Sequence, residues 1–339
     1  MAYTDGNNDP QLAVSTQGLV KAYGGFKAVD GLNLRVPAGG VYGLLGPNGA
    51  GKSTTMKLLL GLTKPTAGSM WLLGQQVGKK SRIQPGRVGS MIEGPSFYPG
   101  LSGLDNCRMV ADYLDLPVSA ASEVLTKVGL RRYEKRKAGA YSLGMKQRLG
   151  IAMALISQPE LLLLDEPTNG LDAEAVVEVR QMIMDLAASA GVTVIISSHI
   201  LSEIEKMAPV VGIIAGGHLL YQGTLENLRE EGHIDLRVSD PGLASEMLEA
   251  QGIHHEYIRK SATLRIPEIP DPQIGSLVTR LVSHGLQVYR VASERKSLEE
   301  AFLELVENPQ NHISQNYVLQ NHVAQSGMKP SGLKRRSTR

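Results

Sequence analysis

The sequence is poor in the features that tie a protein to the cell exterior or to the interior of a membrane. It has one cysteine, Cys107, which has no partner for a disulfide within the chain, so the cytosol is the expected compartment. It has no run of about 18 apolar residues, and its best candidate, "VTVIISSHIL" at 192–201, is too short and too polar to span a bilayer. The segment "MAYTDGNNDPQLAV" has no basic patch before an apolar run, so no signal peptide is expected.

The sequence also has little net charge. Its 35 Lys and Arg nearly balance its 33 Asp and Glu, and the formal charge of +2 is too small to indicate a nucleic-acid partner. A hydrophobic content of 42% and a charged content of 20% are typical of a folded protein. The length of 339 residues allows two domains, or one large domain with an appendage.

Short apolar runs alternate with longer amphipathic runs up to about residue 230. Strands are predicted at 32–36, 41–45, 161–165 and 192–197, and helices at 52–62 and 173–189. Strands that are apolar throughout, such as "LLLLD" at 161–165, are typical of sheets covered on both faces by helices. The order of strand, helix and strand predicts an α/β fold with a parallel sheet and right-handed crossovers.

From about residue 233 the pattern changes to that of a small α+β domain. Strands are predicted at 233–238, 262–266 and 286–291, and helices at 243–252, 274–285 and 297–307. This order predicts a split βαβ arrangement, and Ser297 and Glu300 are spaced as a capping box. The remaining stretch is rich in Asn and Gln and ends in "KRRSTR". We expect it to be a disordered tail with a solvated end rather than a membrane contact.

The run "GPNGAGKS" at 46–53 matches G-x-x-x-x-G-K-[ST] in full and lies between a predicted strand and a predicted helix. Backbone N–H groups of such a loop and the helix N-terminus attract phosphate, Lys52 supplies a charge for the β- and γ-phosphates, and Ser53 offers a hydroxyl to Mg²⁺. A glycine-rich turn can serve packing alone, but the Lys-Ser pair in this context favours a nucleoside triphosphate site. The predicted nucleotide contacts are Gly46, Pro47, Asn48, Gly49, Ala50, Gly51, Lys52, Ser53 and Thr54.

The run "LLLLDEPTNGLD" supplies two adjacent acids after a strand. Asp165 is delivered to the carboxyl edge of the sheet, where it can hold the metal or its water. Glu166 can polarise the attacking water as a general base. The two acids could instead cap the following helix, but that alternative does not explain the leucine strand that delivers them beside a phosphate loop.

In combination and in order, these motifs resemble those of the ATP-binding subunits of ATP-binding cassette (ABC) transporters, over about residues 13–230. "GPNGAGKST" is similar to the Walker A motif and "LLLLDEPTNGLD" to the Walker B motif. The resemblance implies a P-loop NTPase of ABC type, with a mixed sheet core, followed by a small C-terminal α+β domain. The expected divisions are an N-terminal extension at 1–12, an ATP-binding domain at 13–232 with a helical subdomain at about 94–157, an accessory domain at 233–306 and a tail at 307–339.

The resemblance also implies roles for residues far from the phosphate loop. Tyr23 matches the aromatic residue that stacks on adenine, and His199 matches the switch histidine that senses the γ-phosphate. Alone, such residues are more often ordinary core or surface residues. Ser142 and Gly144 in "YSLGMKQR" match signature positions that contact the γ-phosphate of a partner, and Asp172 matches the loop that crosses between subunits. One motif set per chain implies a head-to-tail homodimer that closes on two ATP molecules.

The chain departs from the family pattern in two places. The signature reads Tyr-Ser-Leu-Gly-Met at 141–145, where Leu-Ser-Gly-Gly-Gln is usual. Glu93 stands where the family normally has a Gln that reaches Mg²⁺ and the attacking water and adjoins the membrane partner; a carboxylate can also bind a hard cation. "IEGPSFYPGLSGLDN" and "YSLGMKQRLGIA" resemble the branch that exports, or gives immunity to, bacitracin- and lantibiotic-type peptides, where Glu is usual. We therefore expect Glu93 to be a site residue that links nucleotide state to permease, rather than a surface acid.

The expected function is that of an ATP-binding and ATP-hydrolysing subunit, with ATP and Mg²⁺ as cofactors. It would energise a separate integral-membrane permease at the cytoplasmic face of the cell membrane, and no nucleic-acid partner is expected. Two alternatives are a soluble ABC switch of ribosome or DNA-repair type and a regulatory module with slow hydrolysis. The chain has neither a second cassette nor a long coiled-coil insertion, which disfavours the first, and the presence of both Glu166 and His199 disfavours the second.

Overall fold

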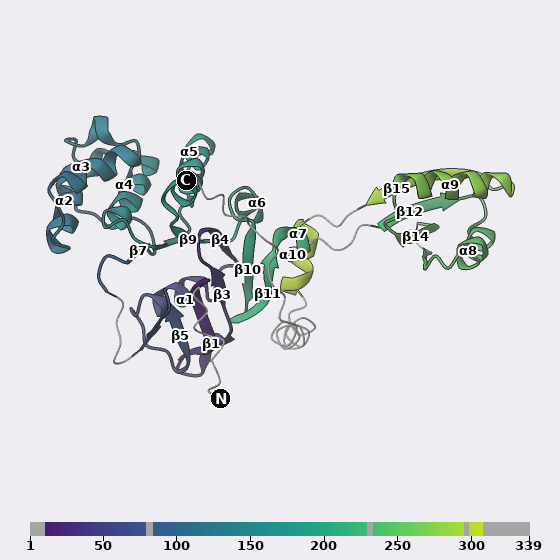
Figure 1. Cartoon of the computed structure of the whole chain (residues 1–339), viewed down its shortest axis with the longest axis horizontal. Coiled ribbons are helices and arrows are strands. Elements are labelled where there is room, and N and C mark those ends of the chain that lie inside the picture. The colour runs from purple at the N-terminus through teal and green to yellow at the C-terminus, as the bar shows by residue number, and fades with distance from the viewer. Residues whose placement is uncertain (1–10, 79–83, 229–232, 260, 295–297, 308–339) are drawn as a thin grey trace, which may run out of the picture. The chain divides into compact units, whose positions relative to one another are not determined.

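The computed structural model describes residues 11–78, 84–228, 233–259, 261–294 and 298–307 (Figure 1). Most of the predicted N-terminal extension, nearly all of the predicted tail and the capping residue Ser297 lie outside these ranges. The described chain forms two compact units. The first contains the residues up to Thr224 and the last helix from Leu305 on, and the second runs from Leu225 to Glu304.

The first unit contains a five-stranded antiparallel sheet in the order β2-β1-β5-β6, with β3 paired to β1. Its strands are β1 (Leu12–Tyr23), β2 (Phe26–Leu32), β3 (Arg35–Pro37), β5 (Ala67–Leu72) and β6 (Gln75–Val77). The single strand predicted over 32–36 is wrong, because the chain breaks between β2 and β3. The break is held by side chains: the Asn33 amide oxygen accepts from the Gly18 N–H at 2.7 Å, and the Thr16 hydroxyl oxygen accepts from the Leu34 N–H at 2.7 Å.

The same unit contains a six-stranded sheet in the order β11-β10-β4-β9-β8-β7. Its strands are β4 (Gly40–Leu45), β7 (Val88–Met91), β8 (Leu161–Asp165), β9 (Thr193–Ser198), β10 (Val210–Ala215) and β11 (His218–Thr224). All neighbours are parallel except β10 and β11, as the sequence predicts for the strands at 41–45, 161–165 and 192–197. Parallel strands end at a common edge, so the segments that follow β4, β8 and β9 meet there.

Helices connect and cover these strands. They are α1 (Lys52–Leu59), α2 (Gly103–Tyr113), α3 (Ser119–Lys127), α4 (Leu143–Leu155), α5 (Ala173–Ala190) and α6 (Leu201–Ile204), with short 3₁₀ turns at Arg131–Tyr133 and Ala138–Ala140. The next helix, α7 (Leu225–Leu228), belongs to the second unit. Helix α1 ends earlier than the predicted residue 62, because Gly61 adopts a left-handed conformation with φ of 70°. Helices α2, α3 and α4 gather in one group, in the region predicted as a helical subdomain (Figure 1).

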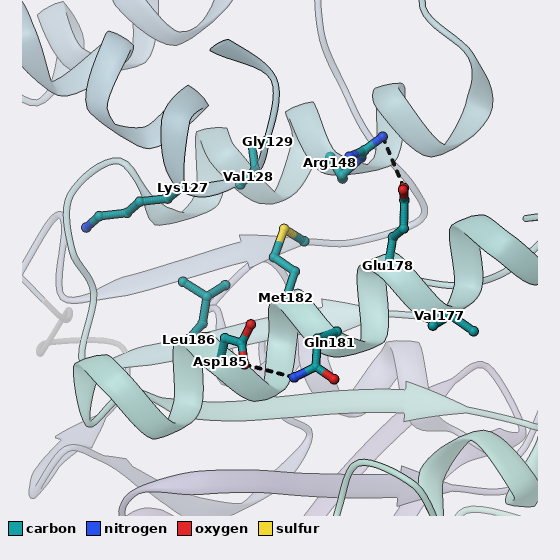
Figure 2. A pocket seen from close by; sticks show the side chains of 10 residues that line it. All are labelled: Lys127, Val128, Gly129, Arg148, Val177, Glu178, Gln181, Met182, Asp185 and Leu186. Atoms are coloured by element: carbon teal, nitrogen blue, oxygen red, sulfur yellow. Dashed lines mark hydrogen bonds and ion pairs between the residues drawn. The ribbon is translucent and has the colours of Figure 1, made fainter. Parts of the chain in front are cut away.

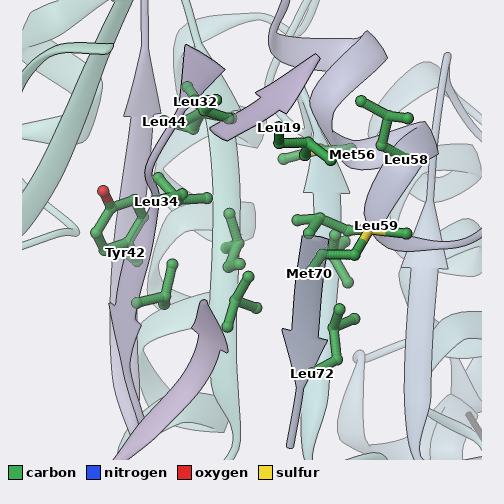
Figure 3. Packing of buried hydrophobic residues seen from close by; sticks show 14 of the residues in the cluster. Leu19, Leu32, Leu34, Tyr42, Leu44, Met56, Leu58, Leu59, Met70 and Leu72 are labelled. Atoms are coloured by element: carbon green, nitrogen blue, oxygen red, sulfur yellow. The ribbon is translucent and has the colours of Figure 1, made fainter. Parts of the chain in front are cut away.

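One apolar cluster joins the two sheets to α1 (Figure 3). It draws side chains from β1, β2 and β5 of the antiparallel sheet, from β4 of the parallel sheet and from α1. All of the following are at most 2% exposed: Leu19, Leu32, Leu34, Tyr42, Leu44, Met56, Leu58, Leu59, Met70 and Leu72. The helix that follows the phosphate loop is therefore anchored along its length in the core, which fixes the direction of its N-terminus.

The second unit is built around a four-stranded antiparallel sheet in the order β13-β14-β12-β15. After α7 its elements are β12 (His233–Val238), α8 (Pro241–Glu249), β13 (Glu256–Ile258), β14 (Thr263–Pro267), α9 (Asp271–Ser283) and β15 (Val288–Glu294). The last helix, α10 (Leu298–Glu307), begins in this unit and ends in the first. One core cluster contains Ile234 and Leu236 from β12 together with Leu248 of α8 and Leu281 of α9, so both helices cover the same face. The order β12-α8-β13-β14-α9-β15 is the predicted split βαβ arrangement with one strand, β13, that the sequence did not indicate.

Within the described ranges, no helix combines the length and the apolar character that a membrane crossing requires.

Candidate functional site

Three segments of the first unit converge at the carboxyl edge of the parallel sheet. The phosphate loop follows β4, the two acids of "LLLLDE" lie at the end of β8, and His199 follows β9. The strand register brings them level, because Leu45 pairs with Ser198 and Asp165 pairs with Ser197. The topology thus brings together residues that the sequence separates by more than a hundred positions.

The phosphate loop needs its glycines because it lies against neighbouring backbone. A side chain at Gly46 would collide with the carbonyl oxygen of Ile214, and one at Gly51 would collide with that of Ala28. Gly51 also has a φ of 107°, which side-chain-bearing residues rarely adopt, and it immediately precedes α1. The backbone N–H groups at this turn and the positive end of α1 form the kind of concave surface that binds phosphate.

Lys52 is held inside this loop. Its side chain is 5% exposed, and its Nζ donates to the carbonyl oxygens of Gly46 at 2.7 Å and Pro47 at 3.1 Å. The Glu166 Oε1 lies 3.7 Å from Nζ. Burial lowers the pKa of Lys52 below its ordinary value, and the nearby carboxylates of Glu166 and Asp165 oppose that shift. The ammonium is therefore prepositioned among acceptors that phosphate oxygens can replace.

A serine that the sequence did not indicate joins the two acids. The Ser197 hydroxyl donates to Oδ1 of Asp165 at 2.5 Å and accepts from the N–H of Glu166 at 2.9 Å. Asp165 is 5% exposed, and this hydrogen bond fixes the orientation of its buried carboxylate. The available signal was the position of Ser197 at the end of the apolar run "VTVIIS", immediately before the serine that precedes His199.

Glu166 has the backbone strain that often accompanies function. Its φ is 47°, an uncommon value for a residue other than glycine. In this conformation its Oε1 lies 3.2 Å from Nδ1 of His199, and it also faces the ammonium of Lys52. The following loop is tied to α6, since the Thr168 hydroxyl donates to a carboxylate oxygen of Glu203. A carboxylate between a histidine and a lysine at an open sheet edge can accept a proton from water.

Glu93 also has a positive φ, 59°, and its carboxylate faces α1. The Lys57 Nζ lies 2.6 Å from Oε1 of Glu93, and this hydrogen bond raises the pKa of Lys57. Lys57 was not singled out from the sequence, because nothing local to it indicates a partner 36 residues away. The loop that carries Glu93 is thus joined directly to the helix that carries Lys52 and Ser53.

Tyr23 lies at the end of β1, and its side chain is half-exposed. The Nζ of Lys21 lies 4.7 Å from the centroid of the Tyr23 ring, and it also donates to the carbonyl oxygen of Lys64 at 2.9 Å. This arrangement is a cation–π contact that restrains the ring. The exposed ring offers a flat apolar surface of the kind on which a base stacks.

The remaining predicted residues form a second group. Ser142 is the N-cap of α4, where its hydroxyl accepts from the Met145 N–H at 3.3 Å, and Asp172 is the N-cap of α5, where it accepts from the Ala175 N–H at 2.9 Å. A Cβ added to Gly144 would lie 3.1 Å from Cβ of Ala175, so the two helix starts are adjacent. Within the described residues, no hydrogen bond joins Ser142 or Gly144 to the phosphate loop.

The donor set is that of a magnesium site completed by its substrate. In the described part of the chain, no group of three or more His, Cys, Asp or Glu residues could hold a metal ion alone. Ser53 and Asp165 provide one hydroxyl and one carboxylate at the same edge, and Mg²⁺ bound to a nucleotide usually takes few protein ligands besides phosphate oxygens and water. The residues present therefore fit the group.

Comparisons with known proteins agree with this arrangement. The family model described as ABC transporter matches residues 29–169. The bacitracin transport ATP-binding protein BcrA of Bacillus licheniformis is 40% identical over 297 residues, which cover 86% of this chain and 97% of that protein. The lantibiotic transport ATP-binding protein SrtF of Streptococcus pyogenes is 46% identical over 218 residues, which cover 63% of this chain and 93% of that protein.

A solved structure of an ATP-binding subunit of an ABC transporter matches this fold with a TM-score of 0.56. The two are 27% identical, and the match covers 64% of this chain and 91% of that one. The predicted fold class, a P-loop NTPase of ABC type with a C-terminal α+β domain, is confirmed. The motifs, the converging sheet edge and the relatives lead to one conclusion: the chain belongs to the ABC transporter family, as a nucleotide-binding ATPase subunit.

Proposed function

We propose that this chain energises a separate membrane permease that exports, or gives immunity to, an antimicrobial peptide or drug. The observation that carries the proposal is the assembled edge of Lys52, Asp165, Glu166 and His199 together with relatives named for bacitracin and lantibiotic transport. On this proposal the chain works at the cytoplasmic face of the membrane through its permease. The peptide class rests on the relatives, whereas the ATP chemistry rests on the geometry.

The proposed chemistry uses the residues at the edge as follows. Adenine stacks on Tyr23, and Lys52 exchanges its two carbonyl acceptors for phosphate oxygens. Glu166 accepts a proton from a water whose oxygen forms a bond to the γ-phosphorus as the bond to the bridging oxygen of ADP breaks. His199, 3.2 Å from Glu166, orients that carboxylate and faces the γ-phosphate. Glu166 would thus be the catalytic base and His199 its partner.

Magnesium would be held by Ser53 and Asp165, with the Ser197 hydroxyl fixing the second of these. When bound it supplies positive charge beside the β- and γ-phosphate oxygens. The proposed third contact, from Glu93, would compete with Lys57 for the same carboxylate, because the Lys57 Nζ already lies 2.6 Å from Oε1. Opening of this pair on nucleotide binding would give Glu93 two states, which is what a linking residue needs.

The proposed active form is a homodimer with shared sites. Support comes from the separation of the two groups of predicted residues within one chain: the phosphate loop lies at the sheet edge, while Ser142 and Gly144 begin α4 beside Asp172. A partner that presents this second group to the γ-phosphate would complete each site. Closure would then depend on ATP, since a ligand shifts an equilibrium only by its differential affinity for the two states.

The permease is proposed to dock beside the loop of Glu93. A cavity of about 480 Å³ lies between β7 and helices α2 and α4, and its lining includes Ile92, Gly94, Tyr113 and Met153. Tyr113 is 85% exposed, and exposed aromatic residues are enriched at interfaces between proteins. An amphipathic helix of the permease would bury these side chains and would sense movements of the loop that carries Glu93.

The test is affinity purification of full-length Glu166→Gln, with ATP, from detergent-solubilised native membranes. The substitution should stop hydrolysis and hold the ATP-loaded complex closed, so a multi-span protein without its own cassette should be recovered in amounts that fall when ATP is omitted. Lys52→Ala in the same background is the control, since it should bind too little nucleotide to trap anything. Recovery of the chain alone, or with ribosomes, would contradict the transporter proposal and favour a soluble switch.

The peptide class has a separate test. A strain that lacks the chain should become more sensitive to bacitracin or to a lantibiotic, and the wild-type gene should restore resistance while the Glu166→Gln variant should not. Unchanged sensitivity to both peptides would overturn the proposed cargo and leave the ATPase assignment intact.

A further inference from the structure

Helices α4 and α5, which begin at the signature and at the crossing loop, touch at two successive levels. At the first level a Cβ on Gly144 would lie 3.1 Å from Cβ of Ala175, so the helices approach as closely as small residues allow. One turn further, the Arg148 Nη2 lies 3.3 Å from Oε2 of Glu178 (Figure 2). Because residues four and three apart share one helix face, both contacts belong to one interface with a fixed register.

A cavity lies beside the Arg148–Glu178 pair, and both residues line it. It has a volume of about 630 Å³ and lies between the end of α3, helix α4 and the second half of α5 (Figure 2). Lys127 and Val128 line its α3 side, and Met182 and Leu186 line its α5 side. Side chains do not fill this space, so the Arg148–Glu178 pair and the close approach of Gly144 and Ala175 are the contacts that join the first turns of α4 and α5.

Arg148 depends strongly on this partner. Its side chain is only 21% exposed, and its Nε is buried with no hydrogen-bond partner among the described residues. Glu178 is 50% exposed and also lines the cavity. A half-buried guanidinium that loses its one carboxylate is left as an uncompensated charge, which favours a shift of the helix toward solvent.

We propose that Arg148 is a positioning residue, which through Glu178 holds the signature start of α4 and the Asp172 start of α5 in one register. The two starts would then meet the partner subunit as one preformed surface. This inference rests on the proposed homodimer, because the surface has a role only where it completes the site of a second chain. It assigns Arg148 no contact with nucleotide, and so predicts a loss of dimer closure without a loss of nucleotide binding.

The experiment measures ATP-dependent dimerisation of the full-length Glu166→Gln chain by sedimentation, and nucleotide affinity by a fluorescent ATP analogue. Adding Arg148→Glu or Glu178→Arg should weaken dimerisation about tenfold or more, because small displacements of positioning groups have large effects. Nucleotide affinity should stay within about twofold, since neither residue touches the phosphate loop. The double exchange, Arg148→Glu with Glu178→Arg, should restore most of the dimerisation.

Two further variants make the result decisive. Glu178→Gln changes a half-exposed side chain and should fold, so it tests the pair if Arg148→Glu does not fold; it should weaken dimerisation in the same direction. Arg108→Glu breaks an ion pair with Asp105 on α2 in which both side chains are about half-exposed, and it should leave dimerisation unchanged. Dimerisation of the folded single variants at the level of the parent would overturn the inference, as would a double exchange no better than either single one.

The same measurement separates this inference from the proposed function. A Glu166→Gln parent that stays monomeric with saturating ATP overturns the homodimer, and the role of Arg148 with it. A parent that dimerises while the Arg148 and Glu178 variants dimerise equally well overturns the inference alone.

Discussion

At the scale of single residues, two acids in left-handed conformations distinguish the candidate site. Glu93 has a φ of 59° and Glu166 a φ of 47°, and each pairs with a lysine of the helix after the phosphate loop. Such conformations cost of order 1–3 kcal/mol each and persist where the surroundings hold them. Both acids therefore lie on strained backbone beside α1. Glu166 is near Lys52 at the start of the helix, and Glu93 is near Lys57 further along it.

The Glu93–Lys57 pair gives a first prediction. Glu93→Gln should leave ATP affinity within about twofold, because the Glu93 side chain is 67% exposed and ion pairs open to solvent contribute at most about 1 kcal/mol. It should alter the coupling between hydrolysis and transport, since the amide cannot form an ion pair with Lys57. The measurement is nucleotide affinity of the purified chain together with peptide resistance of cells that carry the variant.

Lys57→Gln is the matched variant, because it breaks the same pair and keeps the carboxylate. If the pair is what matters, the two variants should change resistance alike; if the carboxylate is what matters, Glu93→Gln alone should do so. Normal resistance in both cell lines would show that Glu93 is not the link to the permease.

At the scale of elements, helix α4 is seated on β7 by glycines. A side chain at Gly89 of β7 would collide with the carbonyl oxygen of Ala154 in α4, and one at Gly150 of α4 would lie 2.7 Å from the sulfur of Met91. Close approach of this kind places the signature helix directly against the sheet whose edge carries the acids. The helical group and the sheet are therefore coupled through backbone contact.

Gly89→Ala should consequently lower the free energy of unfolding by about 1–3 kcal/mol, since the new methyl group forces backbone apart in a packed interior. Urea unfolding of the full chain, followed by circular dichroism, would measure it. Gly100→Ala is the control, because an added Cβ there meets nothing within 4 Å, and it should change stability by less than about 0.5 kcal/mol. Equal stability of the two variants would mean that α4 and β7 are not in close contact.

The converging edge could be predicted because each of its segments follows a long apolar strand, and parallel strands end together. The contacts that depend on strand register or on the tertiary fold could not be predicted. Ser197 lies beside Asp165 only because β8 and β9 pair as they do, and Lys57 reaches Glu93 only through the tertiary fold. The break at Asn33 escaped prediction for the same reason, since the groups that hold it are on β1.

The missed strand β13 has a different cause. It is three residues long, and its side chains are exposed or half-buried, so "EYI" shows neither alternation nor an apolar run. Pairing with β14 makes it a strand. Short edge strands of this kind take their conformation from a neighbour more than from their own residues.

At the scale of the whole molecule, the chain is two units with separate cores. The second unit has its own buried cluster, in which Ile234, Leu236 and Leu264 meet helices α8 and α9. A unit with its own core can fold as a separate body, and a cut at residue 233 removes most of this one together with Leu305–Glu307, which group with the first unit. Its role can thus be tested by deletion.

If the C-terminal domain strengthens the homodimer, deletion of residues 233–339 should weaken ATP-driven dimerisation of the Glu166→Gln chain by at least about tenfold, because a second contact between linked domains multiplies the first. Light scattering with saturating ATP would measure the dimer, and thermal melting would verify that the shortened chain still folds. Nucleotide affinity should be unchanged, since every predicted phosphate contact lies in the first unit. A shortened chain that dimerises as well as the full one would show that the C-terminal domain does not strengthen the homodimer. Its role would then be in regulation or in stability.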